Sequence, residues 1–514
     1  MAEEETKWEL NGPALLITAL VLAAGNFVAV LDTTIANVSV AHIAGGLGAS
    51  NSQGTWVITS YAVAEAIMVP LTGWLAKRFG AVKVFCISLL GFGFFSAVCG
   101  LANSLGMLVI ARVLQGLAGG PLLPLSLTLM LRVFGARRAA AANGVWAMTT
   151  LVAPVTGPVL GGWLCDEYSW PWIFYINVPF AFASTAALYF LFRNHKEKTD
   201  QSPIDKIGLV LLVIWVAALQ IMLDEGKDHD WFESNYIITL AIIATIGFAA
   251  FMIWELTEPN PVVDLKVFRH SGFWTSTVSL CLMFGAFFGI NVTTPLWLQT
   301  CMNFTSTWAG RTTCVQGLAA LTVATLAARL SGTKDCRKLI FCGILWMALI
   351  TYIRSFMDTD VDYWIAAIPL FMMGLGLPFV FVPISTQSMM SVLPEEMDSA
   401  AGLINFCRSL TGAFATSIIN TYWENQTNYK HEQLSYLLDS YGEYFNGLTR
   451  SGIDPEVARG IIDRLTTQQS IMLATNTVMQ ACAVVLVIAA FSIWFGPNTN
   501  KIREEIARRN QQEG

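Results

Sequence analysis

The stretch LVAPVTGPVLGG, residues 151–162, decides how the rest of this chain is interpreted. It lies inside an apolar segment long enough to cross a bilayer, yet it holds two prolines and three glycines. Proline removes a backbone donor and clashes with the preceding turn, so a helix containing it bends. Glycine leaves bare backbone that a neighbouring helix can approach closely. The stretch predicts the pivot of a moving helical bundle. An ordinary kinked membrane helix is the alternative, because proline and glycine are both common in membrane helices.

The composition around this stretch is that of a membrane protein. Of the 514 residues 54% are hydrophobic and only 13% are charged, and the mean hydropathy is +0.55. A soluble protein has about a quarter of its residues charged. The chain has no basic stripe of the kind that binds nucleic acid. Its ten cysteines include no CxxC pair, so neither a metal site nor a disulfide framework is predicted.

The apolar segments predict an all-α polytopic fold. A membrane-crossing helix needs about 20 apolar residues, and fourteen segments meet this requirement. An even number places both termini on the same side of the membrane. The segments are 14–38, 55–75, 84–103, 107–131, 140–164, 171–192, 207–224, 236–256, 273–299, 309–330, 339–357, 363–392, 400–422 and 470–496.

The basic residues predict which side that is. Of the 30 Lys and Arg residues, 20 lie in the termini and in one set of alternating loops, whereas 6 lie in the opposite loops. Cytoplasmic loops of membrane proteins carry the excess of Lys and Arg. We therefore expect both termini in the cytoplasm.

The chain divides into two six-helix halves with a helix pair between them. The long outside loop, 423–469, has helical patterns around 425–440 and 454–468 and predicts either a periplasmic docking surface or a tolerated insertion. The pair at 207–256 is uncharged inside its spans, which is typical of lipid-facing helices and also found in buried ones. The predicted parts are the cytoplasmic N-terminus 1–13, the N-terminal bundle 14–192, the cytoplasmic linker 193–206, the accessory helices 207–256, a second cytoplasmic linker 257–272, the C-terminal bundle 273–496 and the cytoplasmic tail 497–514.

Three ionisable residues stand inside apolar spans of the first half. They are Asp32, Glu65 and Arg112. A charge at the bilayer centre costs at least ~2.5–3.5 kcal/mol on insertion scales, so each of the three residues is expected to have a functional or structural role. Two acids and a base in one half can form a proton relay. In the alternative interpretation Asp32 is a polar link between helices and Arg112 is tied to helix-end carbonyls.

The second half holds two basic residues within its spans. Arg354 lies near a helix end, where it could extend its charge to the membrane surface. Gly402, Asn405, Arg408 and Gly412 share one helical face, which predicts a packing seam or a ligand site. An aromatic stripe around Phe284 predicts either an apolar cavity or part of the packed core of the bundle. The predicted substrate-cavity residues are Thr33, Asn37, Gln115, Phe284, Phe288, Asn291, Gln387, Asn405 and Arg408.

Several of these stretches together resemble a known family. They are the loop GWLAKRFGAVK (73–83), LDTTIANV (31–38), LVIARVLQG (108–116), and Gly144 followed by residues 151–162. The chain resembles the major facilitator superfamily and, within it, the fourteen-helix drug:proton antiporters of the EmrB/QacA type. The resemblance covers nearly the whole chain. It departs at Lys77, where an acid is usual, at Ala153, where a glycine is usual, and at Glu65, where that branch has an uncharged polar residue.

The resemblance implies a function for the predicted sites. Two bundles would rock about a midplane cavity and export hydrophobic or amphipathic drugs across the bacterial inner membrane in exchange for protons. The proton gradient would supply the energy, with no cofactor and no enzymatic step. Asp32, Glu65 and Arg112 would handle the proton. The antiporter-motif helix would carry Gly144, Pro154, Gly157, Pro158, Gly161 and Gly162, and the cytoplasmic loop motif would carry Gly73, Arg78 and Gly80.

The resemblance also implies partners besides the lipid bilayer and small hydrophobic substrates. Transporters of this type work with a periplasmic membrane-fusion adaptor and an outer-membrane channel, and the 423–469 loop is a candidate contact. Two alternatives stay open at this point. One is a dedicated exporter of an endogenous metabolite such as a siderophore or a fatty acid. The other is a non-transporting scaffold or receptor.

Overall fold

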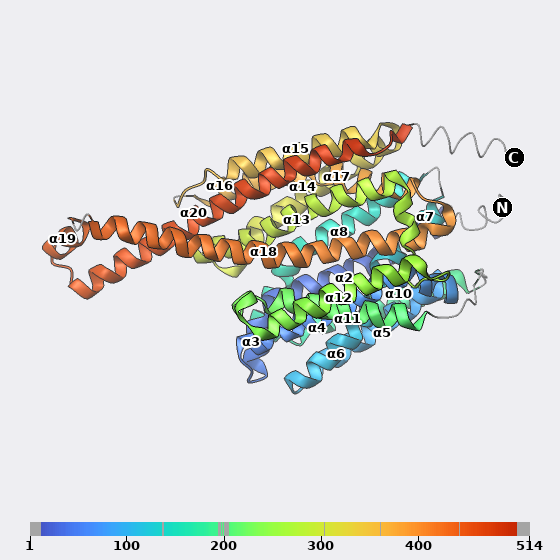
Figure 1. Cartoon of the computed structure of the whole chain (residues 1–514), viewed down its shortest axis with the longest axis horizontal. Helices are drawn as coiled ribbons and strands as arrows, with labels where there is room; N and C mark the ends of the chain where they lie inside the picture. Colours follow the sequence, from blue (N-terminus) through green and yellow to red (C-terminus); the bar gives the residue numbers. More distant parts are fainter. Residues whose placement is uncertain are drawn as a thin grey trace.

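The structure is a computed structural model in which helices account for all the regular secondary structure that is described (Figure 1). The described residues are 12–135, 138–193, 197, 199, 205–302, 304–359, 361–440 and 443–500. Most of the predicted N-terminus and linker, and the tail after residue 500, lie outside this range. An all-α architecture was predicted, and it is confirmed.

The first half of the chain forms the helices of one bundle. Two predicted spans are each built from two helices, because Pro121 interrupts one and a turn at Ile176 interrupts the other. The helices are α2 (Pro13–Gly46), α3 (Asn51–Gly54), α4 (Trp56–Phe79), α5 (Ala81–Gly100), α6 (Leu105–Gly119), α7 (Leu122–Phe134), α8 (Ala139–Glu167), α9 (Trp172–Tyr175) and α10 (Asn177–Phe192).

The second half contains an accessory pair and a second bundle. Here the span 363–392 is divided before Pro378, which begins the next helix. The helices are α11 (Lys206–Glu225), η2 (Trp231–Glu233), α12 (Asn235–Thr257), η3 (Leu265–Arg269), α13 (Ser271–Thr300), α14 (Ser306–Thr333), α15 (Cys336–Arg354), α16 (Tyr363–Gly376), α17 (Pro378–Met390), η4 (Pro394–Glu396), α18 (Met397–Ser440), α19 (Glu443–Arg450), α20 (Pro455–Ser492) and η5 (Ile493–Phe495).

Every predicted span coincides with helix. Twelve spans in the described residues are long and apolar enough to cross a membrane, and the bent helix α8 makes a thirteenth. The remaining predicted span, 400–422, lies within α18. That helix is long enough, but residues such as Asn405 and Arg408 make it too polar to be recognised by apolarity alone. The chain is a multi-pass membrane protein, and the count of fourteen crossings stays a prediction.

The helix containing the stretch 151–162 bends at the predicted place. Its two parts, residues 141–154 and 159–167, meet at an angle of 45°. Pro154 and Pro158 flank the bend, and each lacks the backbone N–H that would continue the helical hydrogen bonding.

Helix packing divides the spans into two bundles. In the N-bundle, α2 packs on α8 and α10, and α4 and α5 pack on α6. In the C-bundle, α13 and α15 pack on α20, α13 also packs on α18, and α14 packs on α16. The bundles meet where α8 packs on α14 and α17, and where α18 packs on α4 and α7.

The accessory helices lie outside the two bundles. Helices α11 and α12 pack on each other, and α11 rests on α4 and α18, one from each bundle. About half of the α12 side chains are exposed, and most of these are apolar, among them Ile242, Ile246 and Ile253. A helix with an exposed apolar surface of this kind suits contact with lipid tails.

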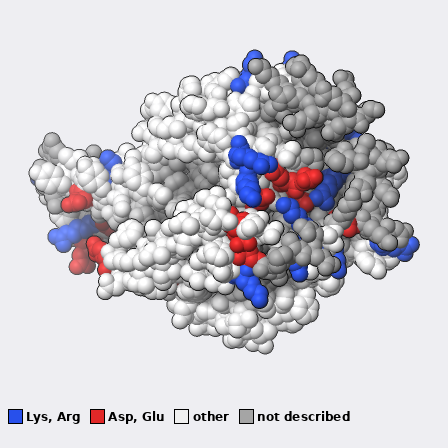
Figure 2. Space-filling view, turned by 45° about the vertical axis from the view of Figure 1, so that its right-hand side comes forward, with Lys and Arg blue, Asp and Glu red and all other residues white. Residues whose placement is uncertain are grey.

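The two ends of the molecule differ in shape and charge. We call the end with the α4–α5 loop at Gly80, residue Glu197 and the start of α18 the linker end, and the end with α19 the hairpin end (Figure 1). Figure 2 brings the linker end forward and shows basic and acidic side chains gathered there, next to a broad uncharged flank. An uncharged band between charged ends is what a bilayer requires.

The bundles are in contact at the linker end. Arg132 of α7 forms an ion pair with Asp398 of α18 at 2.5 Å. The Asn143 side chain of α8 donates to the Thr386 hydroxyl of α17 over 3.1 Å. A Cβ atom added at Gly73 would lie 2.8 Å from Cα of Ser399. These contacts join the N-bundle to the C-bundle and close this end of the interface.

The predicted outside loop continues the membrane helices. Helices α18 and α20 extend past the bundle and are joined through α19, so that they form a helical hairpin (Figure 1). The predicted helical patterns around 425–440 and 454–468 are confirmed by these helices. Lys227, between α11 and α12, pairs with Glu424 at 2.9 Å and connects the accessory pair to the base of the hairpin.

Candidate functional site

A buried ion pair stands at the centre of the N-bundle. Arg112 and Gln115 lie three residues apart on α6 and therefore share a face. The Arg112 guanidinium pairs with the Asp32 carboxylate of α2 at 2.5 Å, and it also donates to Gln115 Oε1 over 2.9 Å. Its Nε donates to the backbone carbonyl of Val57 in α4 over 3.0 Å. One cation thereby connects three helices.

The same carboxylate is held by two further donors. Gln115 Nε2 donates to Asp32 Oδ1 over 3.1 Å, and Asn177 Nδ2 of α10 donates to the same oxygen over 2.7 Å. Arg112 is 0% exposed and Asp32 is 2% exposed. We call Asp32, Arg112, Gln115 and Asn177 the N-bundle cluster.

Aromatic rings enclose the cation of the N-bundle cluster. The guanidinium carbon of Arg112 lies 4.2 Å from the Tyr61 ring centre and 5.6 Å from that of Phe174. A cation over a ring face is attracted by the ring quadrupole, more so where water is excluded. In this conformation Asp32 is fully engaged, so the structure favours the interpretation of Asp32 as a polar link between helices. A proton-handling role for Asp32 and Arg112 stays a prediction.

Glu65 differs from Asp32 in having no close partner. It lies one turn after Tyr61 on α4 and is partly exposed. It forms no hydrogen bond or ion pair with any residue that the structure describes. The positive charge that acts on it most strongly is that of Arg408, on α18 of the other bundle. Glu65 and Arg408 therefore interact electrostatically across the interface between the bundles.

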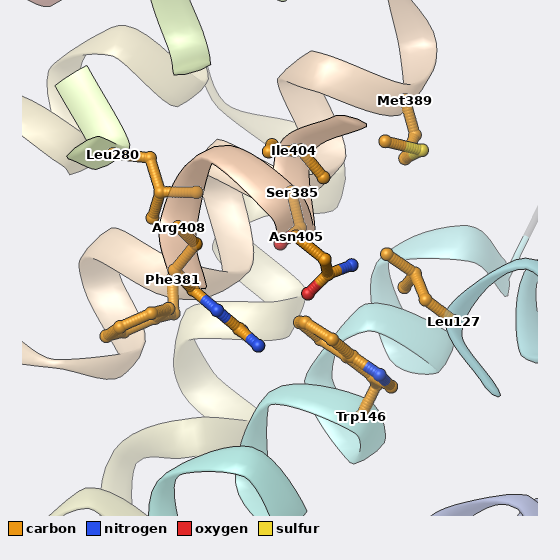
Figure 3. Close-up of a pocket in the computed structure, with 9 residues that line it drawn as sticks. All are labelled: Leu127, Trp146, Leu280, Phe381, Ser385, Met389, Ile404, Asn405 and Arg408. Atoms are coloured by element: carbon orange, nitrogen blue, oxygen red, sulfur yellow. The ribbon is translucent and has the colours of Figure 1, made fainter. Parts of the chain in front are cut away.

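A pocket lies at this interface (Figure 3). The side chains of Trp146 and Leu127, from the N-bundle, face those of Asn405, Arg408 and Phe381, from the C-bundle. The rest of its lining is mostly apolar. The full set is Leu127, Trp146, Leu280, Phe381, Ser385, Met389, Ile404, Asn405 and Arg408.

Aromatic rings from both bundles surround the charge in this pocket. The guanidinium carbon of Arg408 lies 5.8 Å from the Trp146 ring centre and 5.6 Å from that of Phe284. Phe284 stacks on Phe288 with ring centres 5.4 Å apart, and it meets Phe381 edge-on at 6.2 Å. Arg408 makes no hydrogen bond with a described residue, so its donors are free to meet a ligand.

The predicted cavity residues fall in several places. Asn405 and Arg408 line the pocket, and Phe284 and Phe288 adjoin it through ring contacts. Gln115 does not line it, because its amide belongs to the N-bundle cluster.

The other four predicted cavity residues do not line the pocket either. Gln387 is buried on α17 beside Gly496, at the linker end. Asn291 and Thr33 donate to carbonyls of their own helices, those of Phe287 and Val30. The side chain of Asn37 lies outside the described residues.

The expectation that Arg354 could extend to the membrane surface is wrong. It is 3% exposed, and its guanidinium donates to the Thr294 hydroxyl of α13 over 2.8 Å. The reason is that α15 packs on α20 and the Arg354 side chain meets Thr294 of α13, so the arginine is enclosed before it reaches water.

Two glycines of the antiporter-motif helix serve close packing. A Cβ atom at Gly144 would lie 2.9 Å from Cβ of Ala328 in α14, and one at Gly157 would overlap Thr34 of α2. Gly162 has no such neighbour, and Gly161 is buried. The side chain of Pro158 lies outside the described residues. The glycine spacing therefore reflects contacts of α8 with one helix from each bundle.

The loop-motif residues mark the closed linker end. Gly73 meets Ser399 of the C-bundle, and Gly80 ends α4 with a φ of +92°, which favours glycine. The Arg78 guanidinium lies over the rings of Trp74 and Phe79 at 5.6 and 5.8 Å. This loop is thus part of the contact between the bundles.

Sequence reasoning missed most of the pocket lining and some of the residues around Arg112. Trp146 and Phe381 line the pocket, whereas Tyr61 and Asn177 belong to the surroundings of Arg112. A tryptophan or phenylalanine in a membrane span gives no signal of its own. The polar residue Asn177, which begins an apolar helix, could have been found as a candidate partner of the buried charges.

We predict that removing one partner of the buried pair destabilises the fold strongly. Asp32→Asn should lower stability by about 3–5 kcal/mol, because it leaves the Arg112 charge buried without compensation. The double variant Asp32→Asn with Arg112→Gln should lose less than the sum of the two single losses. Thermal unfolding of the detergent-solubilised protein measures both.

The exposed pair Lys227 and Glu424 is the matched control. Both side chains are 46% exposed, and Glu424→Gln should change stability by less than about 1 kcal/mol. Equal losses for Asp32→Asn and Glu424→Gln would contradict a structural role for the N-bundle cluster.

Known proteins with this architecture are transporters. The family model described as Major Facilitator Superfamily matches residues 22–416. The multidrug export protein EmrB of Escherichia coli (strain K12) is 38% identical over 95% of this chain and 96% of its own length. The fatty acid resistance protein FarB of Neisseria gonorrhoeae is 37% identical over 94% of this chain and 96% of its own length.

Solved structures agree on the fold. The proton:xylose symporter XylE matches with a TM-score of 0.58 at 15% sequence identity, over 95% of this chain and 97% of that chain. The predicted family resemblance is confirmed by the family model and by the EmrB relative. The chain therefore belongs to the major facilitator superfamily, a family of membrane transporters rather than enzymes.

Proposed function

We propose that this protein is a proton-coupled exporter of hydrophobic and amphipathic compounds in a bacterial inner membrane. The similarity to the multidrug export protein EmrB supports the class of cargo. The excess of Lys and Arg in the loops of the linker end supports a cytoplasmic location of that end. The hairpin would then project into the periplasm.

The observation that carries the coupling is the electrostatic attraction between Glu65 and Arg408. Glu65 belongs to the N-bundle and Arg408 to the C-bundle, so their attraction favours contact between the bundles. Binding of a proton to Glu65 cancels this attraction. A ligand that changes the energy of an interface shifts the balance between conformations that make and break it.

The pocket lies at the same interface and holds only about 10 Å³ in this closed conformation, so the exported compound would occupy it when the bundles separate. A compound between Trp146 and Phe381 would touch both bundles at once and lie beside Arg408. Proton and compound then act on one contact, which is the condition for their exchange. A membrane potential of 100 mV contributes about 2.3 kcal/mol per charge moved, enough for useful accumulation.

We predict that Glu65→Gln abolishes the gradient-driven part of transport. The amide keeps the shape of the side chain but cannot exchange a proton. In proteoliposomes with an imposed pH gradient, accumulation of a fluorescent hydrophobic compound should fall at least about ten-fold, while exchange down the compound's own gradient persists. Glu424→Gln should leave both unchanged. Gradient-driven accumulation of normal size by Glu65→Gln would refute this role.

We predict that the aromatic side of the pocket sets affinity and not coupling. Phe284→Ala removes the ring that faces Arg408 and Phe288, and KM for an aromatic compound should rise about three- to ten-fold. The ratio of transport with and without the pH gradient should stay constant. Phe495, 79% exposed at the linker end, is the control, and Phe495→Ala should behave like the unaltered protein. An unchanged KM for Phe284→Ala would contradict the assignment of the pocket as the binding site.

We further propose that the hairpin of α18, α19 and α20 contacts a periplasmic membrane-fusion adaptor, with an outer-membrane channel beyond it. Its support is that the hairpin extends past the apolar bundle and carries exposed apolar residues such as Tyr436, Leu437 and Leu465. A photo-reactive group at Tyr436 should cross-link to a periplasmic protein in cells, whereas one at Ile246 of α12 should not. Equal labelling from both positions would contradict the assignment.

A dedicated exporter of one metabolite is the second candidate. The relative FarB, a fatty acid resistance protein, favours this possibility. Competition decides between the two, because a broad exporter would be inhibited by many dissimilar compounds and a dedicated one by close analogues alone. A scaffold that transports nothing would show no flux in the same assay.

A further inference from the structure

A group of charged residues at the linker end is not used by the proposed transport mechanism. Its centre is Glu197, which lies in the connection between the N-bundle and α11. One carboxylate oxygen of Glu197 accepts from the backbone N–H of Ala81 over 3.0 Å, and the other accepts from that of Val82 over 3.1 Å. These two N–H groups begin α5, which has no acidic residue in its first turn and no side-chain cap of its own.

The glycine at the end of α4 leaves space for this carboxylate. Gly80 joins α4 to α5 with a φ of +92°, and a Cβ atom at this position would overlap the Glu197 carboxylate. The first N–H groups of a helix have no partner within the helix and attract negative charge. Glu197 therefore supplies, from a distant part of the chain, the cap that α5 lacks.

The carboxylate also faces the cation that joins the bundles. Arg132 of α7 lies 3.6 Å from Glu197 on one side and 2.5 Å from Asp398 of α18 on the other. Partial burial raises the pKa of Glu197 above its ordinary value, while Arg132 and the two backbone N–H groups act in the opposite direction. Glu197, Arg132 and Asp398 form a charge chain from the linker through the N-bundle to the C-bundle.

We propose that Glu197 is a positioning residue of the gate at the linker end: it caps α5 and holds Arg132 toward Asp398, so that the closed state includes the contact of Glu197 with both. This inference rests on the proposed rocking of the two bundles. When the linker end opens, Arg132 and Asp398 separate, and Glu197 must release or follow Arg132. Glu197 is thus a part of the gate.

The sequence of the α4–α5 loop agrees with this role. The stretch 73–83 holds three basic residues, Lys77, Arg78 and Lys83, and no acid. The chain therefore lacks a carboxylate within the loop and provides one from Glu197, beside the start of α5. Without Glu197, Arg132 keeps one acidic partner among the residues of the charge chain, and α5 loses its cap.

The test measures how often the linker end is open. Spin labels at Lys77→Cys in the N-bundle and Lys338→Cys in the C-bundle, both at exposed positions, report the separation of the bundles by pulsed electron resonance. The labels are introduced into the full chain, in a background without reactive native cysteines. Glu197→Gln should increase the ratio of open to closed molecules about ten-fold, because backbone hydrogen bonds to a charged acceptor are lost. Glu197→Asp, which keeps the carboxylate, should restore at least half of the closed population.

A matched control separates this effect from a general loss of charge. Glu395 is an exposed acid three residues before Asp398 at the same end, and Glu395→Gln should leave the distance distribution unchanged. Asp398→Asn should shift it in the same direction as Glu197→Gln. Thermal unfolding should be nearly equal for all four variants, which shows that the fold is retained.

The outcomes also distinguish this inference from the proposed function. An identical distance distribution for Glu197→Gln and the unaltered protein overturns the role of Glu197, whatever the transport assay shows. A distribution that responds to Glu197→Gln supports the gate even if Glu65→Gln leaves transport unchanged. A separation that never changes, with substrate, pH or any variant, overturns the rocking of the bundles itself and this inference with it.

Discussion

The structure depends on one physical constraint, the cost of keeping charge inside an apolar bundle. Arg112 meets that cost with the Asp32 carboxylate, the Gln115 amide, the Val57 carbonyl and the ring of Tyr61. These groups come from three different helices, and Asn177 adds a fourth through Asp32. A single cation therefore links α2, α4, α6 and α10.

The charges at the interface between the bundles are arranged differently. Glu65 and Arg408 have no hydrogen bonds within the described structure, and each belongs to a different bundle. Protonating a carboxylate that is fully bonded weakens those bonds, whereas protonating a carboxylate without a close partner breaks none. This contrast between Asp32 and Glu65 is the reason to assign the fold to the first and the coupling to the second.

The sequence predicted the helices better than the sites. Apolar length located thirteen of the fourteen predicted spans, and Pro154 and Pro158 located the bend of α8, because both signals are local. The roles of Asp32 and Glu65 could not be distinguished in advance, since the difference lies in partners such as Asn177 and Arg408 that are more than a hundred residues away. Gln387 was a reasonable cavity candidate, but the direction in which α17 turns it depends on packing that no local pattern records.

The pocket and the gate could not be predicted from the sequence for the same reason, because both are formed by residues far apart in the chain. Trp146 and Phe381 look like any other aromatic residues of a membrane span, and only the meeting of α8 with α17 brings them together. Glu197 stood in a charged linker whose composition predicted a connection and nothing more. The capping role of Glu197 becomes visible only in the structure, where its carboxylate lies beside the uncapped start of α5.

The central claim is that proton and exported compound exclude each other at the interface of Glu65 and Arg408. The most direct measurement is proton release from the purified protein in weakly buffered solution, followed with a pH indicator while a transported compound is added to saturation. The account predicts that the unaltered protein releases protons on binding and that Glu65→Gln binds the compound and releases none. Release of equal size from both proteins, or binding to the unaltered protein with no release at all, would contradict it.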